Sequence, residues 1–278
     1  MHQETIQRIE GGRRTRGDAP DRKPLVSIIT VVFNGGEAFA PTMDSVLFQS
    51  YIDYEWIVVD GGSTDGTVQQ IVSREDKIDY WLSEPDRGIY DAMNKALTLA
   101  RGTWVYFLNS GDTFVNPYIL AQVAAVLTET AAEIVVGYVR VVSAGILKGR
   151  FPLDFVDTKT ARKLFRNRFC HQALFVRHQS YSAVGGFDLT FPTFADFQAC
   201  YKIVRKAGGF ERCNIEIANF DLGGVSSDYR RSAELYMERE SLFEGCGEGK
   251  TRLSYLAGLL RAHAYRYKRS IQEKRPWI

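Results

Sequence analysis

The first hundred residues alternate between short apolar runs and polar, glycine-rich breaks. Residues 26–32 (VSIITVV) and 55–59 (EWIVV) are dominated by β-branched side chains, a pattern typical of strands that are covered on both faces. Residues 80–82 (YWL) are predicted to form a short strand, and residues 103–108 (TWVYFL) the next one. We therefore predict four strands in the first 108 residues, of which 26–32 and 55–59 are buried on both faces.

Helical periodicity fills the segments between these strands. A helix is predicted from about Thr42 to Gln49, and a second begins after the turn at 64–67. Over residues 89–100 the apolar positions recur every three or four residues, and Gly102 follows where a helix-terminating glycine is expected. The alternation of strand and helix predicts an α/β fold of the Rossmann-like kind, with a mixed, mostly parallel sheet flanked by helices.

The second half of the chain has a mixed pattern. Residues 133–142 and 173–177 are typical of strands, and residues 197–204 are typical of a helix that stops before two glycines. No linker rich in Pro, Gly or Ser and no internal repeat divides the chain. Residues 1–23 are polar and arginine-rich, so a flexible tail is predicted there.

Residues 250–278 differ from the rest of the chain in charge. They carry eight Lys or Arg residues against one acidic residue, and their apolar positions fall on one helical face. A basic amphipathic helix of this kind binds an anionic membrane surface, or it docks on its own domain with the basic face in water. Both interpretations stay open.

Composition and charge exclude several classes of protein. The chain has 278 residues, of which 45% are hydrophobic and 24% charged, and a net charge of +2, which excludes disordered, fibrous and dedicated nucleic-acid-binding proteins. No apolar run approaches the roughly 18 residues of a membrane span, and the first residues lack the apolar core of a secretory signal. Four scattered cysteines without a C-x-x-C pair predict free thiols in a reducing cytoplasm.

Short polar side chains follow the predicted strands. Asn34, Asp60 and Asp112 stand at strand ends, and Asp65 lies a few residues beyond. Ligands of open α/β sheets bind at the carboxyl ends of the strands, so these residues predict a binding site in which Asp60 accepts from a nucleobase N–H or a ribose hydroxyl. Each of them could instead cap a turn or a helix, and Asp65 before Gly66 fits that alternative best.

The glycines near these residues do not form a known phosphate-binding loop. Their positions at 61, 62 and 66 do not match G-x-G-x-x-G, and the chain has no G-x-x-x-x-G-K-[ST] segment. NAD-binding and P-loop folds are therefore excluded.

Three sequence segments occur in a fixed order: VSIITVVFN, VVDGGSTDGT and SEPDRGIYDAMNKALTLARGTWVYFLNSGD. Together they resemble family 2 glycosyltransferases of the GT-A fold, and among these the enzymes of bacterial exopolysaccharide and colanic acid synthesis. The resemblance covers residues 24–228. It implies a nucleotide-binding half at 24–115 and an acceptor half at 116–228, with the tail at 1–23 before them and basic C-terminal helices at 229–278 after them.

The resemblance also implies a donor site. The matching positions for nucleotide and donor sugar are Thr30, Phe33, Asn34, Asp60, Ser63, Asp65, Asp86, Gly88 and Asn94. Thr30, Phe33 and Asn34 match the segment that lies against the nucleobase, and Asp60 matches the carboxylate that holds the base and ribose. Gly88 would let the backbone approach the ligand closely. Asn94 has the alternative of being an ordinary polar helix position.

The metal motif of the family is thinned in this chain. Family members carry D-x-D-D, whose carboxylates hold Mn²⁺ or Mg²⁺ on the donor diphosphate, whereas this chain has Asn109-Ser110-Gly111-Asp112. Phosphate oxygens and water can complete the shell of a hard cation, so one carboxylate can suffice. Asp112 is the expected ligand, with Asn109 as a weaker helper. Metal-independent catalysis and a helix-capping role for Asp112 are the alternatives.

A catalytic base is expected from the second half. Residues 185–188 (GGFD) followed by Ala195-Asp196 resemble the family pattern G-G-F-D…[E]-D, so Asp196 matches the carboxylate that deprotonates the acceptor hydroxyl. His171 and Gln172 resemble a subgroup feature near the sugar or acceptor. The alternatives are a helix N-cap for Asp196 and a buried, hydrogen-bonded core position for His171.

The resemblance implies an inverting glycosyltransferase that moves one sugar from a nucleotide-sugar to a glycan or lipid-linked oligosaccharide in bacterial cell-surface polysaccharide synthesis. The Q-x-x-R-W signature of polymer synthases is absent, which favours the addition of a single sugar. The enzyme is expected in the cytoplasm, or peripherally on the inner face of the plasma membrane through residues 250–278. UDP and GDP donors both fit.

Two other functions are weighed against this one. A sugar-1-phosphate nucleotidyltransferase is disfavoured because residues 33–37 do not form the glycine-rich G-x-G-T loop that it needs. A non-catalytic nucleotide- or glycan-binding relative or scaffold stays open, since the metal motif is thinned.

Overall fold

The computed structural model describes residues 8–19, 21–143, 145–151, 170–207 and 209–221, and the single residues 234, 237, 238 and 241. Apart from those four positions, the basic helices predicted at 229–278 lie outside the described residues. Within the described part of the chain, no helix combines the length and apolar character needed to cross a bilayer.

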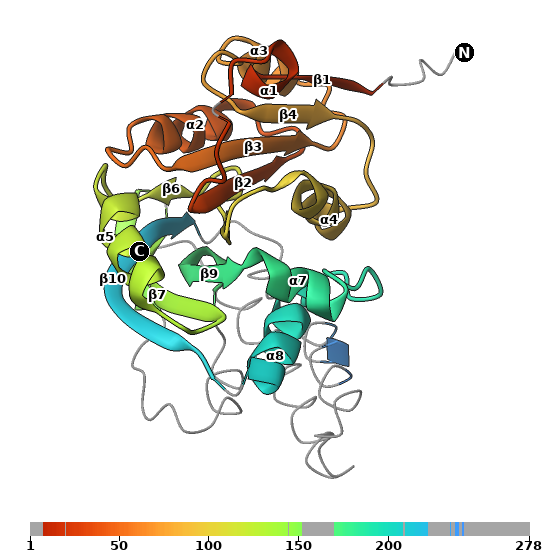
Figure 1. Ribbon diagram of the computed structural model, residues 1–278. Helices are drawn as coiled ribbons and strands as arrows, with labels where there is room; N and C mark the ends of the chain where they lie inside the picture. The colour runs from red at the N-terminus through yellow and green to blue at the C-terminus, as the bar shows by residue number, and fades with distance from the viewer. Residues whose placement is uncertain are drawn as a thin grey trace, which may run out of the picture.

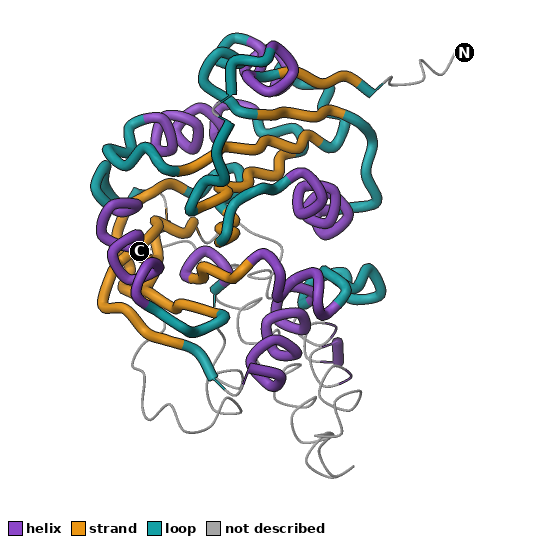
Figure 2. The backbone as a smooth tube through the Cα atoms, viewed as in Figure 1, coloured by secondary structure: helices purple, strands orange, loops and turns teal. Residues whose placement is uncertain are grey.

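The described strands form one ten-stranded sheet that runs through both halves of the chain (Figure 1, Figure 2). Its order is β1-β4-β3-β2-β5-β9-β7-β10-β6, with β8 paired to β7. The strands are β1 (Ile9–Gly11), β2 (Val26–Val32), β3 (Tyr54–Asp60), β4 (Tyr80–Ser83), β5 (Trp104–Phe107), β6 (Thr113–Phe114), β7 (Ile134–Ser143), β8 (Ile146–Phe151), β9 (Leu174–Arg177) and β10 (Glu211–Asp221). Strands β4, β3, β2 and β5 are parallel, whereas β9 joins β5 and β7 in antiparallel pairing. The predicted α/β class is confirmed.

Helices cover both faces of this sheet (Figure 1). They are α1 (Arg13–Arg16), α2 (Phe39–Leu47), α3 (Thr67–Val72), α4 (Ile89–Leu99), α5 (Ile119–Glu129), α7 (His178–Val184) and α8 (Ala195–Ala207), with 3₁₀ turns η1 (Gly36–Ala38) and η2 (His171–Ala173). One core contains Ile29 and Ile57 and packs against α4, α7 and α8. The other contains Ile28 and Trp56 and packs against α2, α3 and α5. Because successive side chains of a strand point to opposite faces, β2 is buried along its whole length.

Residues 9–16 form secondary structure, and the prediction of a flexible tail is wrong for them. Strand β1 pairs antiparallel with β4, with Ile9 opposite Ser83. Helix α1 continues this pairing, since the backbone N–H of Arg13 donates to the carbonyl of Ile78 over 2.9 Å. The prediction failed because the free edge of β4 supplies hydrogen-bond partners that local composition does not reveal.

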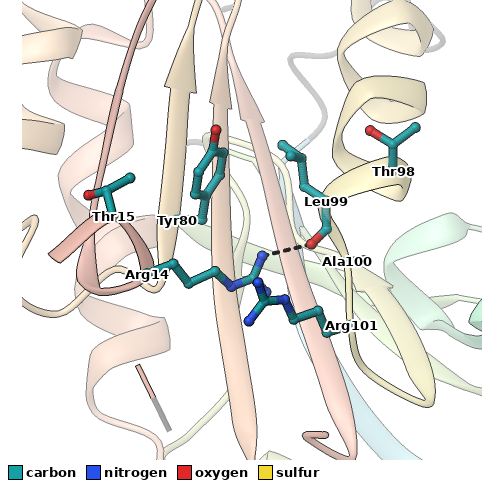
Figure 3. A pocket seen from close by; sticks show the side chains of 7 residues that line it. All are labelled: Arg14, Thr15, Tyr80, Thr98, Leu99, Ala100 and Arg101. Carbon is teal, nitrogen blue, oxygen red and sulfur yellow. Dashed lines mark hydrogen bonds between the residues drawn. The ribbon is translucent and has the colours of Figure 1, made fainter. Parts of the chain in front are cut away.

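The Arg14 side chain fastens this N-terminal segment to α4 (Figure 3). Its guanidinium donates to the carbonyl oxygen of Leu99 over 2.7 Å and forms an ion pair with the buried Glu55. Burial, together with the nearby Arg101, lowers the pKa of Arg14 to about 10, so the guanidinium stays charged at neutral pH. A hollow of about 360 Å³ lies beside Arg14 and Arg101. Because Arg14 is paired with Leu99 and Glu55, it joins the N-terminal segment to α4, and the hollow lies at this junction.

Candidate active site

The loops after β2 and β3 are joined by hydrogen bonds at the carboxyl edge of the sheet. Asn34 has a positive φ of 48°; its Oδ1 accepts from Thr64 N over 2.9 Å, and its backbone N–H donates to Ser63 Oγ over 2.7 Å. Asp65 Oδ1 accepts from the hydroxyl (2.6 Å) and backbone N–H (3.1 Å) of Thr67, and the hydroxyl contact lowers the pKa of Asp65. Asn34, Ser63 and Asp65 therefore shape this edge, and the turn-capping alternative is observed for Asp65.

Asp60 and Thr30, two predicted nucleotide contacts, are enclosed in the protein interior. Both are 0% exposed. Asp60 Oδ2 accepts from Ser63 N (2.9 Å) and Ser83 Oγ (2.6 Å), and its Oδ1 accepts from the Ser63 hydroxyl. The hydroxyl of Thr30 accepts from Trp56 Nε1 over 3.1 Å. Both groups are therefore paired within the protein, and the nucleotide contacts predicted for them stay predictions.

Asp86 is a half-buried carboxylate at this edge, and it lies beside the ring of Phe33. Its Oδ1 accepts from Gly88 N over 2.8 Å, while its Oδ2 lies over Gly61, so close that a Cβ at position 61 would overlap it. The Phe33 ring, 63% exposed, flanks the same glycine. Burial raises the pKa of Asp86 above its ordinary value, and the nearby Asp60 acts in the same direction. A desolvated carboxylate beside an aromatic face suits a planar ring that offers an N–H.

Gly88 and Asn94, predicted beside the donor, have structural reasons for their identity. Gly88 precedes α4 with a φ of 108°, which favours glycine, and a Cβ there would meet no described atom within 4 Å. The positive φ at this position, and not steric crowding around a Cβ, therefore explains why residue 88 is a glycine. Asn94 donates to the carbonyl of Phe187 and accepts from its N–H, both over 2.8 Å. The Asn94 amide is thus occupied within the protein.

Asp112 follows β5 and is held by Gln172. It is 6% exposed, and its Oδ2 accepts from Gln172 Nε2 over 2.7 Å. Gln172 is also buried, its Oε1 accepts from Cys170 Sγ over 2.6 Å, and it supports Asp112; its place near the sugar or acceptor stays a prediction. Because Asp112 precedes β6 and not a helix, the helix-capping alternative is wrong.

A chain of four side chains links α4 and the end of β5 with the 3₁₀ turn η2 and the start of α8. Asn109 Nδ2 lies 3.0 Å from His171 Nε2, and His171 Nδ1 lies 2.9 Å from Asp196 Oδ2. The Tyr90 hydroxyl lies 2.9 Å from Asp196 Oδ1. Since an amide N–H can only donate, His171 accepts at Nε2 and carries its proton on Nδ1, from which it donates to Asp196. Asp196 lies in the first turn of α8 with its side chain 18% exposed.

Residues 27–185, more than half of the chain, match a known family, Glycosyl transferase family 2, and Asp196 lies beyond the matched residues. The chain belongs to that family. It is 34% identical over 216 residues to an uncharacterized glycosyltransferase of Mycobacterium tuberculosis strain H37Rv, covering 76% of this chain and 80% of the relative. It is 34% identical over 179 residues to a PGL/p-HBAD biosynthesis glycosyltransferase of Mycobacterium bovis BCG, covering 63% and 67%. The predicted family and enzyme class are confirmed.

Solved structures share the fold of this family 2 glycosyltransferase. A mannosyltransferase from Pyrobaculum calidifontis in complex with GDP-Man and Mn²⁺ matches with a TM-score of 0.61 at 19% identity, covering 88% of this chain and 70% of the other. Residues 1–349 of S. aureus TarS in complex with UDP-GlcNAc match with a TM-score of 0.60 at 17% identity, covering 86% and 72%. At these identities the likeness shows the shared fold alone.

The thinned metal motif of this glycosyltransferase fits a hard divalent cation that is held largely by its substrate. Among the described residues, no group of three or more His, Cys, Asp or Glu side chains is placed to bind a metal. The Oδ1 atom of Asn109 is buried and has no hydrogen-bond partner in the described part of the chain. An unpaired buried oxygen is costly unless a ligand completes it. Together with the Asp112 carboxylate it offers oxygen atoms, the ligand type that Mg²⁺ and Mn²⁺ prefer.

Tyr90 and Glu238 contribute to the site of this glycosyltransferase although sequence reasoning did not select them. Tyr90 belongs to the I-Y-D-A-M-N segment that carries the resemblance, but its helical spacing with Met93 and Leu97 is typical of a core residue. Glu238 Oε1 accepts from Thr193 N over 2.7 Å, across 45 residues of chain. Tyr90 could have been found from the motif, whereas no local signal points to Glu238.

Proposed function

We propose that this protein is an inverting glycosyltransferase that transfers one sugar from a nucleotide-sugar donor to a hydroxyl of a glycan or lipid-linked oligosaccharide. One observation carries the proposal. Asp196 is a partly exposed carboxylate on the first turn of α8, and His171 holds it by a hydrogen bond. The other ring nitrogen of His171 contacts Asn109, which follows β5.

Asp196 acts as the general base in this proposal. It takes the proton of the acceptor hydroxyl while that oxygen forms a bond to C1 of the donor sugar. The bond from C1 to the diphosphate oxygen breaks, and its electron pair leaves with the nucleoside diphosphate. A single displacement at C1 inverts the configuration there. His171 keeps the carboxylate oriented through a hydrogen bond from its Nδ1–H group to Oδ2.

Phe33 and Asp86 form the proposed seat of the donor nucleotide. The exposed ring of Phe33 offers a face on which a nucleobase can stack, and Asp86 Oδ2 offers an acceptor for an N–H or a ribose hydroxyl. Gly61 lies between them, and its lack of a Cβ lets Asp86 and Phe33 approach its backbone closely. Uridine and guanosine both meet these requirements, in keeping with the UDP-GlcNAc and GDP-Man complexes of the two structural neighbours.

Asp112 and the Oδ1 atom of Asn109 are the proposed protein ligands of a divalent cation, Mn²⁺ or Mg²⁺. The cation would offset the negative charge that develops on the leaving diphosphate. The mannosyltransferase neighbour was solved with Mn²⁺, which supports this part of the proposal.

We place the reaction in bacterial cell-surface polysaccharide synthesis, in the cytoplasm or on the inner face of the plasma membrane. The M. bovis relative is named for PGL/p-HBAD biosynthesis, which supports a biosynthetic role. The eight basic residues of 250–278 suit an anionic lipid surface that would bring the enzyme to a lipid-linked acceptor.

The decisive experiment compares Asp196→Asn with the wild type. The variant keeps the side-chain shape but cannot take a proton, so kcat is expected to fall about 10²- to 10⁴-fold while the donor still binds. Asp44→Asn is the matched control, because Asp44 is 46% exposed on α2 and lies outside the site. Nucleotide release is measured with UDP- and GDP-sugars in Mn²⁺, Mg²⁺ or EDTA, and product stereochemistry by NMR.

Three outcomes would contradict parts of the proposal. Turnover of Asp196→Asn close to that of the wild type would refute the base assignment. A product with retained configuration would refute the single displacement. Donor binding by the wild type without transfer or slow hydrolysis would favour the non-catalytic alternative.

A further inference from the structure

The start of helix α8, which carries Asp196, and the loop just before it are held from one side by Tyr90 of α4. The Tyr90 hydroxyl lies 2.9 Å from Asp196 Oδ1 and 2.5 Å from the carbonyl oxygen of Thr193. The tyrosine is 7% exposed, and its ring packs against Phe187 at a centroid distance of 5.7 Å. Burial first, and the neighbouring Asp196 carboxylate second, raise the pKa of Tyr90 well above its ordinary value. The hydroxyl therefore keeps its proton and stays a hydrogen-bond donor.

The same loop is held from the other side by Glu238. Its Oε1 accepts from the backbone N–H groups of Thr193 (2.7 Å) and Phe194 (2.8 Å), immediately before α8 begins. A carboxylate at this end of a helix is also favoured by the helix dipole. Glu238 thus fixes the backbone from which the side chain of Asp196 projects.

Helix α4 connects these contacts with the donor side. Asp86, of the proposed nucleotide seat, accepts from Gly88 N just before the helix begins. Tyr90 follows within the first turn, and Asn94 one turn later holds the backbone of Phe187 with two hydrogen bonds of 2.8 Å. Because a helix has a fixed rise per residue, α4 holds the Asp86 segment and the start of α8 at a defined separation.

We infer that Tyr90 and Glu238 are positioning residues for Asp196, a role that presupposes Asp196 to be the base proposed above. The Tyr90 hydroxyl can serve both proton states of the carboxyl group. While Asp196 is ionised, the tyrosine O–H donates to Oδ1. Once Asp196 has taken the proton of the acceptor, its O–H donates to the tyrosine oxygen, and the tyrosine O–H turns to the carbonyl of Thr193. The carboxyl group thereby keeps one position before and after proton transfer.

The first test is Tyr90→Phe, which removes only the hydroxyl and keeps the ring on Phe187. We expect kcat to fall about tenfold or more, since looser positioning of a catalytic group costs up to about 10²-fold. The donor Kd and donor KM are expected to stay within about twofold of wild type, because the contact is made to the base and not to the nucleotide. A wild-type kcat would overturn the role of Tyr90. So would a rise in KM and a loss of thermal stability that match the fall in kcat.

Tyr181→Phe is the matched control. The ring of Tyr181 packs on the same Phe187, at 5.2 Å, but its hydroxyl pairs with Cys200. Its removal is expected to leave kcat unchanged. An equal loss of kcat in this control would show that the effect of Tyr90→Phe comes from the packing around Phe187, and would overturn the inference.

Glu238 is tested by rescue. Glu238→Ala removes the acceptor for both backbone N–H groups and is expected to lower kcat about tenfold, whereas Glu238→Gln keeps an oxygen that accepts from them and is expected to retain most of the activity. A wild-type kcat in Glu238→Ala, or an equal loss in both variants, would overturn the role of Glu238.

A double variant separates this inference from the base assignment. If Tyr90 acts through the carboxylate, Tyr90→Phe lowers kcat no further in the Asp196→Asn background. A full additional loss overturns the inference and leaves the base assignment intact. Wild-type turnover of Asp196→Asn alone overturns the base assignment instead.

Discussion

Replacing Gly61 by alanine tests the proposed nucleotide seat with a single methyl group. The added Cβ would lie 3.1 Å from Asp86 Cγ and 3.3 Å from Phe33 Cδ2, and closer still to Asp86 Oδ2. Carbon atoms rest at about 3.5–4.0 Å, so the carboxylate must retreat by roughly 0.5–1 Å. Gly61 has no positive φ, so the backbone accepts alanine without strain and the effect is steric alone.

The expected cost follows from the hydrogen bond that Asp86 would lose. A hydrogen bond to a charged group contributes about 1.5–3 kcal/mol, which corresponds to about 10- to 100-fold in Kd. Calorimetric titration of UDP and GDP measures this loss directly. At saturating donor, kcat is expected to change little, because Asp196 lies on another element.

The matched control for this variant is Gly209→Ala. It makes the same chemical change at a position with ordinary φ, and its Cβ would meet no described atom within 4 Å. Gly209→Ala is expected to bind nucleotide as the wild type does. The reasoning is refuted if Gly61→Ala binds the preferred nucleotide as tightly as Gly209→Ala while Asp86→Asn binds it more weakly. Asp86 would then contact the ligand without needing the space above Gly61.

Three further predictions concern metal, stability and pH. Asp112→Asn is expected to abolish the extra thermal stabilisation that Mn²⁺ adds to a bound nucleoside diphosphate, and an unchanged Mn²⁺ dependence would remove Asp112 from the metal site. Arg14→Met leaves the buried Glu55 without its cation and is expected to lower the free energy of unfolding by about 3–5 kcal/mol. Arg16→Met, at a more exposed ion pair with Glu75, is expected to cost at most about 1 kcal/mol; denaturant titration measures both, and equal losses would contradict the prediction. The pKa of Asp91, hydrogen-bonded by Arg87, and that of Asp188, hydrogen-bonded by Thr190, lie below the ordinary 3.8. These carboxylates therefore stabilise the fold above that value, and the contribution is lost as the pH falls below it, so the fall in Tm with acidification should be shallower in Asp91→Asn.

Local sequence pattern was sufficient for the architecture of the first half. The strand predicted at 26–32 has those bounds in the structure, and the helix predicted over 89–100 is α4. A run of β-branched residues and a three-to-four-residue apolar period act through near neighbours in the chain, so they can be recognised without knowledge of the fold. The motifs also predicted Asp112 after a strand and Asp196 at the start of a helix, where the structure has them, and their roles in the site stay predictions.

The sequence could not show which of its polar groups are already paired within the protein. Asp60 and Asp86 both follow strands in motifs of the same resemblance. Only the folded chain reveals that Asp60 is buried and hydrogen-bonded to Ser63 and Ser83, while Asp86 is half-buried beside Gly61.

Sequence by itself determined the α/β class and the family and predicted the edge of the sheet for the candidate site, because these depend on residues near one another in the chain. Tertiary structure alone decided the pairings within the site. Tyr90 meets Asp196 across 106 residues, and Asn109 meets His171 across 62. Strand β1 likewise found its partner at the edge of β4, far along the chain. Such contacts depend on how the sheet brings distant segments together, which no local periodicity encodes.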